Sequence, residues 1–229
     1  MLQKETNRIL SEIYNGLNEN LTVEGIELLK EKVRQIIRIE SRNVSKGKFS
    51  WYDYVLDDKL RPVMNGVYYD QGYKVASDCR VLLAVKESYD ESLEGKIEAK
   101  DGSFIEGRYP NWRGVIPNDI EGCRHFEINE SLFYDKVKDL RAEYKAATGK
   151  GCRWSKDWFV KFDDLKLSAE QFDKFIRAMK QYNRTTFYNR NNRRCAFIND
   201  EDFKLLLMPC NPDVTDEDEC KIIDMTPKE

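Results

Sequence analysis

The chain has 229 residues with a formal net charge of −3, and 41% of its residues are hydrophobic and 12% aromatic. This composition excludes a globally disordered chain, and the length fits one large or two small domains. The sequence contains no apolar run of about 18 residues. It also lacks a basic segment followed by an apolar one at its amino terminus. Neither a membrane span nor a secretory signal is therefore predicted, and a cytoplasmic location without membrane contact is expected.

The first 48 residues predict two helices and a loop. Apolar residues recur at helical spacing within 4–18 and again within 26–37, where the second pattern follows Thr22, a suitable N-cap. The polar stretch 41–48 (SRNVSKGK) breaks the pattern and is expected to be a loop.

Residues 51–117 have the composition of strands. Apolar residues alternate on both sides of the turn sequence Asp70-Gln71-Gly72, which predicts a hairpin. The run 80–86 is mostly apolar and predicts a strand that is covered on both faces. The Asp101-Gly102 pair predicts another turn, between residues 96 and 108.

The second half of the chain predicts a helix, a strand, a second helix and further strands. Asn129 can cap the first helix, and Gly149 and Gly151 can end it. In the second helix, which follows the strand at 158–162, Ser168 and Gln171 have the spacing of a capping box. The remaining strands are predicted as follows: 184–189, 193–198 and 203–208.

These elements predict an α+β fold in which helices accompany antiparallel sheets. The sequence Pro117-Asn118-Asp119 suits a boundary between two such units. The division is then an N-terminal unit at 1–118, a C-terminal unit at 119–212 and an acidic tail at 213–229, whose apolar residues near 222–225 can dock locally.

Charge is distributed unevenly along the chain. Residues 141–194 contain 14 Lys/Arg against 6 Asp/Glu, whereas 196–229 contain 3 against 10. Outward Lys and Arg side chains can neutralise phosphates, so the basic zone is a candidate DNA-binding face, although a merely solvated surface has the same composition. The candidate DNA-binding residues are Lys174, Arg177, Lys180, Arg184, Arg190, Arg193 and Arg194.

Three separated stretches resemble the bacterial sliding clamp, the beta subunit of DNA polymerase III. They lie at 61–85 (RPVMNGVYYDQGYKVASDCRVLLAV), 109–117 (YPNWRGVIP) and 203–209 (FKLLLMP). The clamps carry patterns close to LNG…VATDGHRLA, FPDYRRVLP and VVMP. The chain departs from them where Cys79 alone replaces Gly-His and where Gly114 replaces an arginine. A whole clamp domain also has no counterpart in it.

The resemblance implies a DNA-clamp-like fold and a non-enzymatic protein that associates with DNA and binds partner peptides in an apolar pocket. The implied partners are DNA and the short peptides of DNA polymerase or other replication and repair proteins. No cofactor or metal is implied, and a shortened chain could close a ring only as a homo-oligomer. The implied peptide-binding residues are Ser77, Arg80, Val81, Pro110, Val115, Leu206, Leu207, Met208 and Pro209.

Two alternatives stay open. One is a monomeric clamp-fold protein-interaction module that has lost ring formation and DNA binding. The other is an enzyme acting on nucleic acid, although the single histidine, His125, has no nucleophile motif beside it and adjacent acidic pairs point to opposite faces of a strand. The six cysteines form no Cys-x-x-Cys pair, so reduced thiols are expected rather than a metal site.

Overall fold

The computed structural model describes residues 32–33, 49–190, 195–209 and 220–227. The first predicted N-terminal helix lies outside the described residues, as does the second except for 32–33, which are helical. Arg193, Arg194 and most of the acidic segment before residue 220 also lie outside them.

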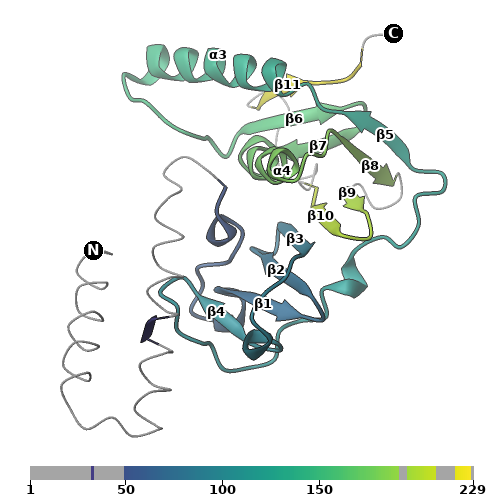
Figure 1. The fold of residues 1–229 in the computed structure, drawn as a ribbon. Coiled ribbons are helices and arrows are strands. Elements are labelled where there is room, and N and C mark those ends of the chain that lie inside the picture. Colours follow the sequence, from purple (N-terminus) through teal and green to yellow (C-terminus); the bar gives the residue numbers. More distant parts are fainter. Residues whose placement is uncertain (1–31, 34–48, 191–194, 210–219, 228–229) are drawn as a thin grey trace, which may run out of the picture.

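The larger of two sheets has eight strands in the order β4-β1-β2-β3-β10-β9-β8-β5, and every neighbouring pair is antiparallel (Figure 1). Its strands are β1 Gly66–Asp70, β2 Tyr73–Ser77, β3 Val81–Lys86, β4 Ile97–Ala99, β5 Arg124–Glu127, β8 Thr186–Arg190, β9 Cys195–Asn199 and β10 Phe203–Leu207.

The smaller sheet has the order β11-β6-β7, with β6 at Trp158–Phe162, β7 at Leu165–Ser168 and β11 at Lys221–Asp224. Two α-helices accompany the sheets in the described part of the chain, α3 at Glu130–Thr148 and α4 at Ala169–Gln181. Short 3-10 turns occur at η1 Trp51–Asp53, η2 Pro62–Met64, η3 Glu91–Leu93 and η4 Arg113–Val115. The predicted α+β class is confirmed.

The first hairpin is confirmed, and its turn has the expected backbone geometry. Tyr69 pairs with Lys74 and Asp70 with Tyr73, which leaves Gln71 and Gly72 as the two loop residues. Their φ angles are +50° and +81°, as a type I′ turn requires, and this turn matches the twist of the two strands.

The pairing of β3 with β10 joins residues more than 100 positions apart. Five residue pairs form, from Val81 with Leu207 to Val85 with Phe203. Because β3 and β10 lie in the middle of the sheet and are covered on both faces, nearly all of their side chains are buried. The sheet therefore runs across the boundary predicted at 117–119, and the division into units stays a prediction.

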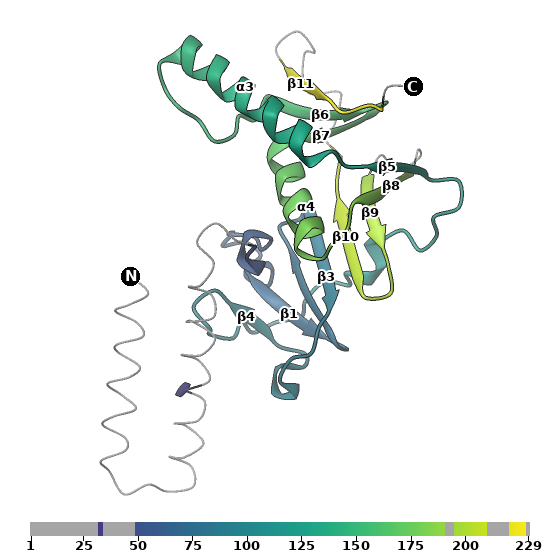
Figure 2. The same ribbon diagram turned by 45° about the horizontal axis from the view of Figure 1, so that its top comes forward.

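Successive residues of β3 enter two different apolar clusters because side chains alternate along a strand. Val81, Leu83 and Val85 face the cluster that holds both helices, whereas Leu82 and Ala84 face a cluster closed by the loop at 109–116. Helix α4 contacts β3 and β10 on one side and β6 and β7 on the other, so it fills the space between the sheets (Figures 1 and 2).

The ends of the two helices differ in how closely they follow prediction. Helix α3 begins as expected, since Asn129 Oδ1 accepts a hydrogen bond from the Leu132 N–H at 3.0 Å, and it ends at Gly149 with φ +72°. The capping box predicted for α4 is wrong, because Ser168 makes no side-chain capping bond and Gln171 is buried. Ser168 is still part of β7, so the chain passes from strand to helix without a separate capping turn.

Candidate functional site

The three stretches that resemble the clamp motifs meet around one cavity of about 640 Å³. The strand register causes this meeting, because Leu206 pairs with Leu82 and the Met208 N–H donates to the Arg80 carbonyl at 2.8 Å. The loop at 109–116 packs over the same face of the sheet. The lining residues are Arg61, Met64, Ser77, Cys79, Arg80, Val81, Leu82, Tyr109, Pro110, Asn111, Trp112, Gly114, Val115, Cys195, Leu206 and Met208.

Seven of the nine predicted peptide-binding residues line this cavity; Leu207 and Pro209 do not. Leu207 is fully buried in the cluster on the opposite face of the sheet, because it alternates with Leu206 and Met208 along the strand. Of the lining residues that were not predicted, most lie within or beside the same three motifs. Cys195 lies on β9, and nothing in the sequence indicates its place.

The floor of the cavity is buried and its rim is exposed. Leu82 and Leu206 are at most 6% exposed, whereas Val115 is 49% and Met208 48% exposed. Exposed apolar side chains around an apolar cavity are typical of a binding site rather than of a packed core.

The turn between β2 and β3 forms one wall and is held by its own side chains. Asp78 Oδ1 accepts hydrogen bonds from the N–H groups of Arg80 (2.9 Å) and Val81 (2.7 Å), and Ser77 Oγ accepts one from the Cys79 N–H (3.1 Å). The second oxygen of Asp78 pairs with Lys174 Nζ at 2.6 Å. This ion pair connects the wall to α4, across the sheet from the cavity.

The opposite wall is the loop at 109–116, which is fixed to the first hairpin. Trp112 Nε1 donates to Asp70 Oδ2 at 2.8 Å, and Arg113 pairs with the same carboxylate while its guanidinium lies 4.2 Å from the Trp112 ring. Tyr109 stacks on Tyr68 with ring centroids 4.7 Å apart, and burial is the main cause that raises the pKa of its hydroxyl. Both walls are therefore held in place by contacts within the chain.

The five predicted DNA-binding residues that the structure describes do not form a free basic face. Each of them that the structure describes pairs with a carboxylate, most often one supplied by another element. The pairs are Lys174 with Asp78, Arg177 with Asp53 and Asp173, Lys180 with Glu130, Arg184 with Asp200 and Asp202, and Arg190 with Asp119.

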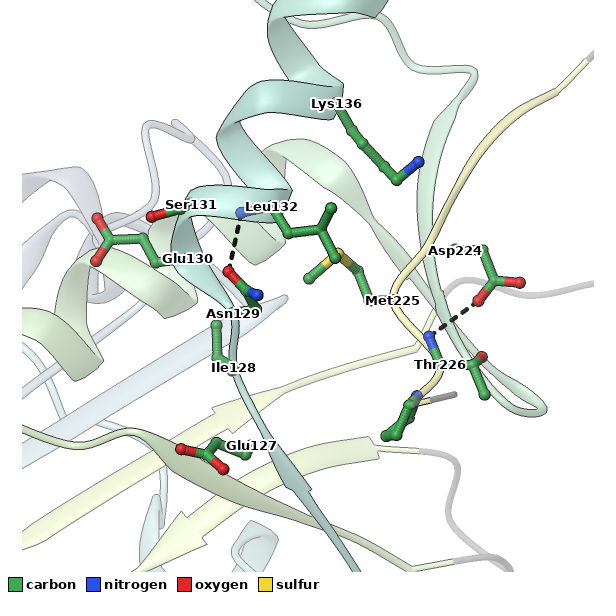
Figure 3. A pocket seen from close by; sticks show the side chains of 11 residues that line it. Glu127, Ile128, Asn129, Glu130, Ser131, Leu132, Lys136, Asp224, Met225 and Thr226 are labelled. Carbon is green, nitrogen blue, oxygen red and sulfur yellow. Dashed lines mark hydrogen bonds between the residues drawn. The ribbon is translucent and has the colours of Figure 1, made fainter. Parts of the chain in front are cut away.

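A larger cavity, of about 1070 Å³, lies between the start of α3 and the end of β11 (Figure 3). The capping bond of Asn129 and a bond from the Thr226 N–H to Asp224 Oδ1 (2.9 Å) shape it. Hydrogen bonds from Thr226 lower the pKa of Asp224. The lining is mixed, with Glu127 and Lys136 beside Leu132 and Met225, and contains none of the predicted site residues.

Within the described ranges, no group of three or more His, Cys, Asp or Glu side chains has the arrangement of a metal site. The same residues contain no helix with the length and apolarity that a bilayer crossing requires.

No protein-family model matches the chain, and no curated protein sequence is similar enough to indicate a relative. Solved structures are similar to it. A protein from Eubacterium rectale described as a DNA polymerase III beta subunit is 13% identical, with a TM-score of 0.45, and the match covers 70% of this chain and 61% of that one. The DNA polymerase sliding clamp of Bacillus subtilis is 14% identical, with a TM-score of 0.44 and coverages of 70% and 60%.

The Helicobacter pylori beta clamp, in a structure with a bound DNA ligase peptide, is 13% identical, with a TM-score of 0.41 and coverages of 69% and 60%. The chain thus spans about three fifths of the length of these structures. It is similar, at a distance, to the bacterial sliding clamps that its three motifs resemble.

Proposed function

We propose that this chain is a non-enzymatic protein-interaction module that binds a short peptide in the cavity between the β2–β3 turn, the loop at 109–116 and the end of β10. The observation that carries the proposal is the convergence of three distant stretches on one apolar cavity with exposed Val115 and Met208 at its rim. An apolar side chain that enters such a cavity contributes about 1.5–3 kcal/mol to binding, which suits an apolar anchor residue.

Polar groups at the rim suit the rest of a peptide. Arg80 and Asn111 are exposed lining residues that can hydrogen-bond a peptide backbone, and Arg80 can also pair with an acidic side chain. Both walls are already held by hydrogen bonds and ion pairs, so little ordering accompanies binding. Met208 adds an adaptable surface for more than one anchor.

DNA association is less well supported by the geometry than peptide binding. A cation that already pairs with a carboxylate neutralises a phosphate only after that pair is broken. The ion pairs of α4 and of Arg184 therefore favour the module without DNA binding over a DNA clamp. Ring formation stays a prediction, which a measurement of mass in solution tests.

The proposal is tested by selecting short random peptides against the full chain by phage display and titrating the selected peptide by fluorescence anisotropy. We expect Val115→Asp to weaken binding about tenfold or more, because it places a carboxylate at the apolar rim. Ile222→Asp is the matched control, since Ile222 is also apolar and 41% exposed but lies on β11, outside the cavity. Equal affinity of the two variants would refute the site.

DNA binding is tested separately, with a labelled duplex titrated at low and moderate salt. The proposed module should show weak binding that Lys180→Glu leaves unchanged. Tight binding that falls steeply with salt and weakens in Lys180→Glu would instead favour the DNA clamp.

A further inference from the structure

Two arginines supply the charge at the mouth of the peptide cavity. Among the described residues that line it, Arg61 and Arg80 are exposed and charged, and no Asp or Glu is among them. The chain as a whole has a formal net charge of −3, so the charge at this mouth is opposite in sign to that of the molecule. The cavity therefore opens through a cationic site on an acidic protein.

The charge of Arg80 is not compensated by its surroundings. Within the described residues its guanidinium forms no ion pair and no hydrogen bond. The acidic residue nearest to it in sequence, Asp78, is already engaged, because one oxygen accepts the N–H groups of Arg80 and Val81 and the other pairs with Lys174 Nζ at 2.6 Å. The guanidinium of Arg80 is therefore free to pair with a bound molecule.

Arg61 adds a second cation whose charge is partly neutralised. Its Nε pairs with Asp58 Oδ2 at 3.2 Å, while its side chain stays 56% exposed. Its Nη1 donates to Cys79 Sγ at 3.3 Å. Because Cys79 directly precedes Arg80, both cations lie on the wall that the β2–β3 turn forms.

The strand register places Arg80 beside the apolar part of the mouth. The Met208 N–H donates to the Arg80 carbonyl at 2.8 Å, and Leu82, two residues after Arg80, lines the cavity. Residues two apart along a strand share a face, so the side chain of Arg80 lies on the cavity side of the sheet. On the opposite wall, Val115 is apolar and 49% exposed. The mouth thus combines a cationic wall with an apolar one.

This combination fits an acidic peptide better than a nucleic acid. Proteins that bind single strands stack bases on accessible aromatic rings. The aromatic side chains that line the cavity, Tyr109 and Trp112, are only 6% and 3% exposed. A peptide instead offers both an apolar side chain for the cavity and carboxylates for the two arginines.

We propose that the partner is an acidic segment, an extended peptide that inserts one apolar side chain into the cavity and presents flanking Asp or Glu side chains to Arg80 and Arg61. This inference rests on the proposed function. Arg80 contributes more than Arg61, because Arg61 has to share its guanidinium with Asp58. A carboxylate that pairs with Arg80 through two hydrogen bonds also fixes the position of the peptide relative to its anchor.

The test uses the full chain, the selected peptide and an analogue of that peptide in which Asn and Gln replace every Asp and Glu. The selected peptides should contain more Asp and Glu than the unselected library. In anisotropy titrations, Arg80→Gln should weaken binding of the acidic peptide about fivefold and Arg61→Gln about twofold, while neither changes the affinity for the neutral analogue. Added salt should reduce the difference between the two peptides, because it screens exposed charges.

Two variants serve as controls. Arg153→Gln should change neither affinity, since Arg153 is also exposed and without an ion pair in the described part of the chain but lies outside the cavity lining. Met208→Ala should weaken both peptides equally, because the apolar contact does not depend on the charge of the peptide.

Selected peptides without acidic enrichment, or equal weakening of both peptides by Arg80→Gln, would overturn the acidic partner and leave the peptide cavity standing. Binding of the acidic peptide that Met208→Ala and Val115→Asp leave unchanged would refute the proposed function, and the anchored segment with it. A single-stranded oligonucleotide that binds more tightly than the peptide and loses affinity in Arg80→Gln would overturn the inference and assign the mouth to phosphates.

Discussion

Removing the charge of Asp78 should lower the unfolding free energy and loosen one wall of the cavity. The Asp78–Lys174 pair has an N–O distance of 2.6 Å, and its side chains are only 9% and 19% exposed. Asp78→Asn is the most specific change, because its amide oxygen can still accept the N–H groups of Arg80 and Val81 while the ion pair is lost.

The burial of the pair sets the size of the effect. Breaking a fully buried ion pair by removing one partner costs about 3–5 kcal/mol, and an exposed pair is worth about 0.2–1 kcal/mol. Because the pair is mostly but not fully buried, we expect an intermediate loss of about 2 kcal/mol for Asp78→Asn. Lys174→Met, which keeps the apolar stem, should cost about 1–2 kcal/mol, since Asp78 retains two N–H donors.

Urea unfolding of the wild type, both single variants and the double variant gives the coupling energy, which should be about 1–2 kcal/mol. Lys180→Met serves as control because Lys180 also forms an ion pair, with Glu130, but is 67% exposed; its cost should stay below about 0.5 kcal/mol. A coupling energy under about 0.3 kcal/mol would show that the pair does not connect the turn to α4.

Three further predictions address the cavity, the helix ends and pH. Met208→Ala should weaken binding of the selected peptide about fivefold, because a peptide that covers the exposed half of this side chain gains about 1 kcal/mol. The control, Leu132→Ala, changes the cavity beside α3 and should leave the affinity for the peptide unchanged. Asn129→Ala should cost about 1 kcal/mol in urea unfolding, whereas Ser168→Ala should cost less than about 0.5 kcal/mol because its hydroxyl makes no capping bond; equal costs would contradict this. Burial and, after it, the hydrogen bond to Glu94 raise the pKa of Tyr89 to about 12, so the folded state holds this proton more tightly than the unfolded state does. The stability of the wild type should therefore fall as the pH rises from 10 to 12, and the fall should be smaller in Tyr89→Phe.

Local features of the fold could be predicted because they depend on neighbouring residues. The turn at Gln71 and Gly72 follows from a glycine, which adopts positive φ freely, in a short polar segment between alternating strands. The start of α3 follows from the ability of Asn129 to accept the Leu132 N–H. Ser168 has the same local chemistry, yet it continues β7, so pairing with β6 overrides the capping pattern.

The ion pairs of the basic zone could not be predicted from composition. A charge count along the sequence reports how many cations a segment holds, not which carboxylates the fold brings to them. The partners of Lys174 and Arg177 on other elements, Asp78 and Asp53, lie 96 and 124 positions away. The position of β11 could not be predicted either. It pairs in parallel with β6, about 60 residues earlier in the chain, and no local sequence pattern indicates that partner.

The cavity shows where alternation along a strand adds to a sequence resemblance. The resemblance at 203–209 implies that Leu206, Leu207 and Met208 all bind the peptide, but neighbouring side chains of a strand point to opposite faces. Leu206 and Met208 line the cavity, and Leu207 enters the core beneath α4. Leu207→Ala should therefore act through stability, at a cost of about 2–5 kcal/mol, while Met208→Ala acts through binding. Loss of peptide affinity in a Leu207→Ala variant that keeps its unfolding free energy would place Leu207 in the cavity and refute the register of β10 with β3.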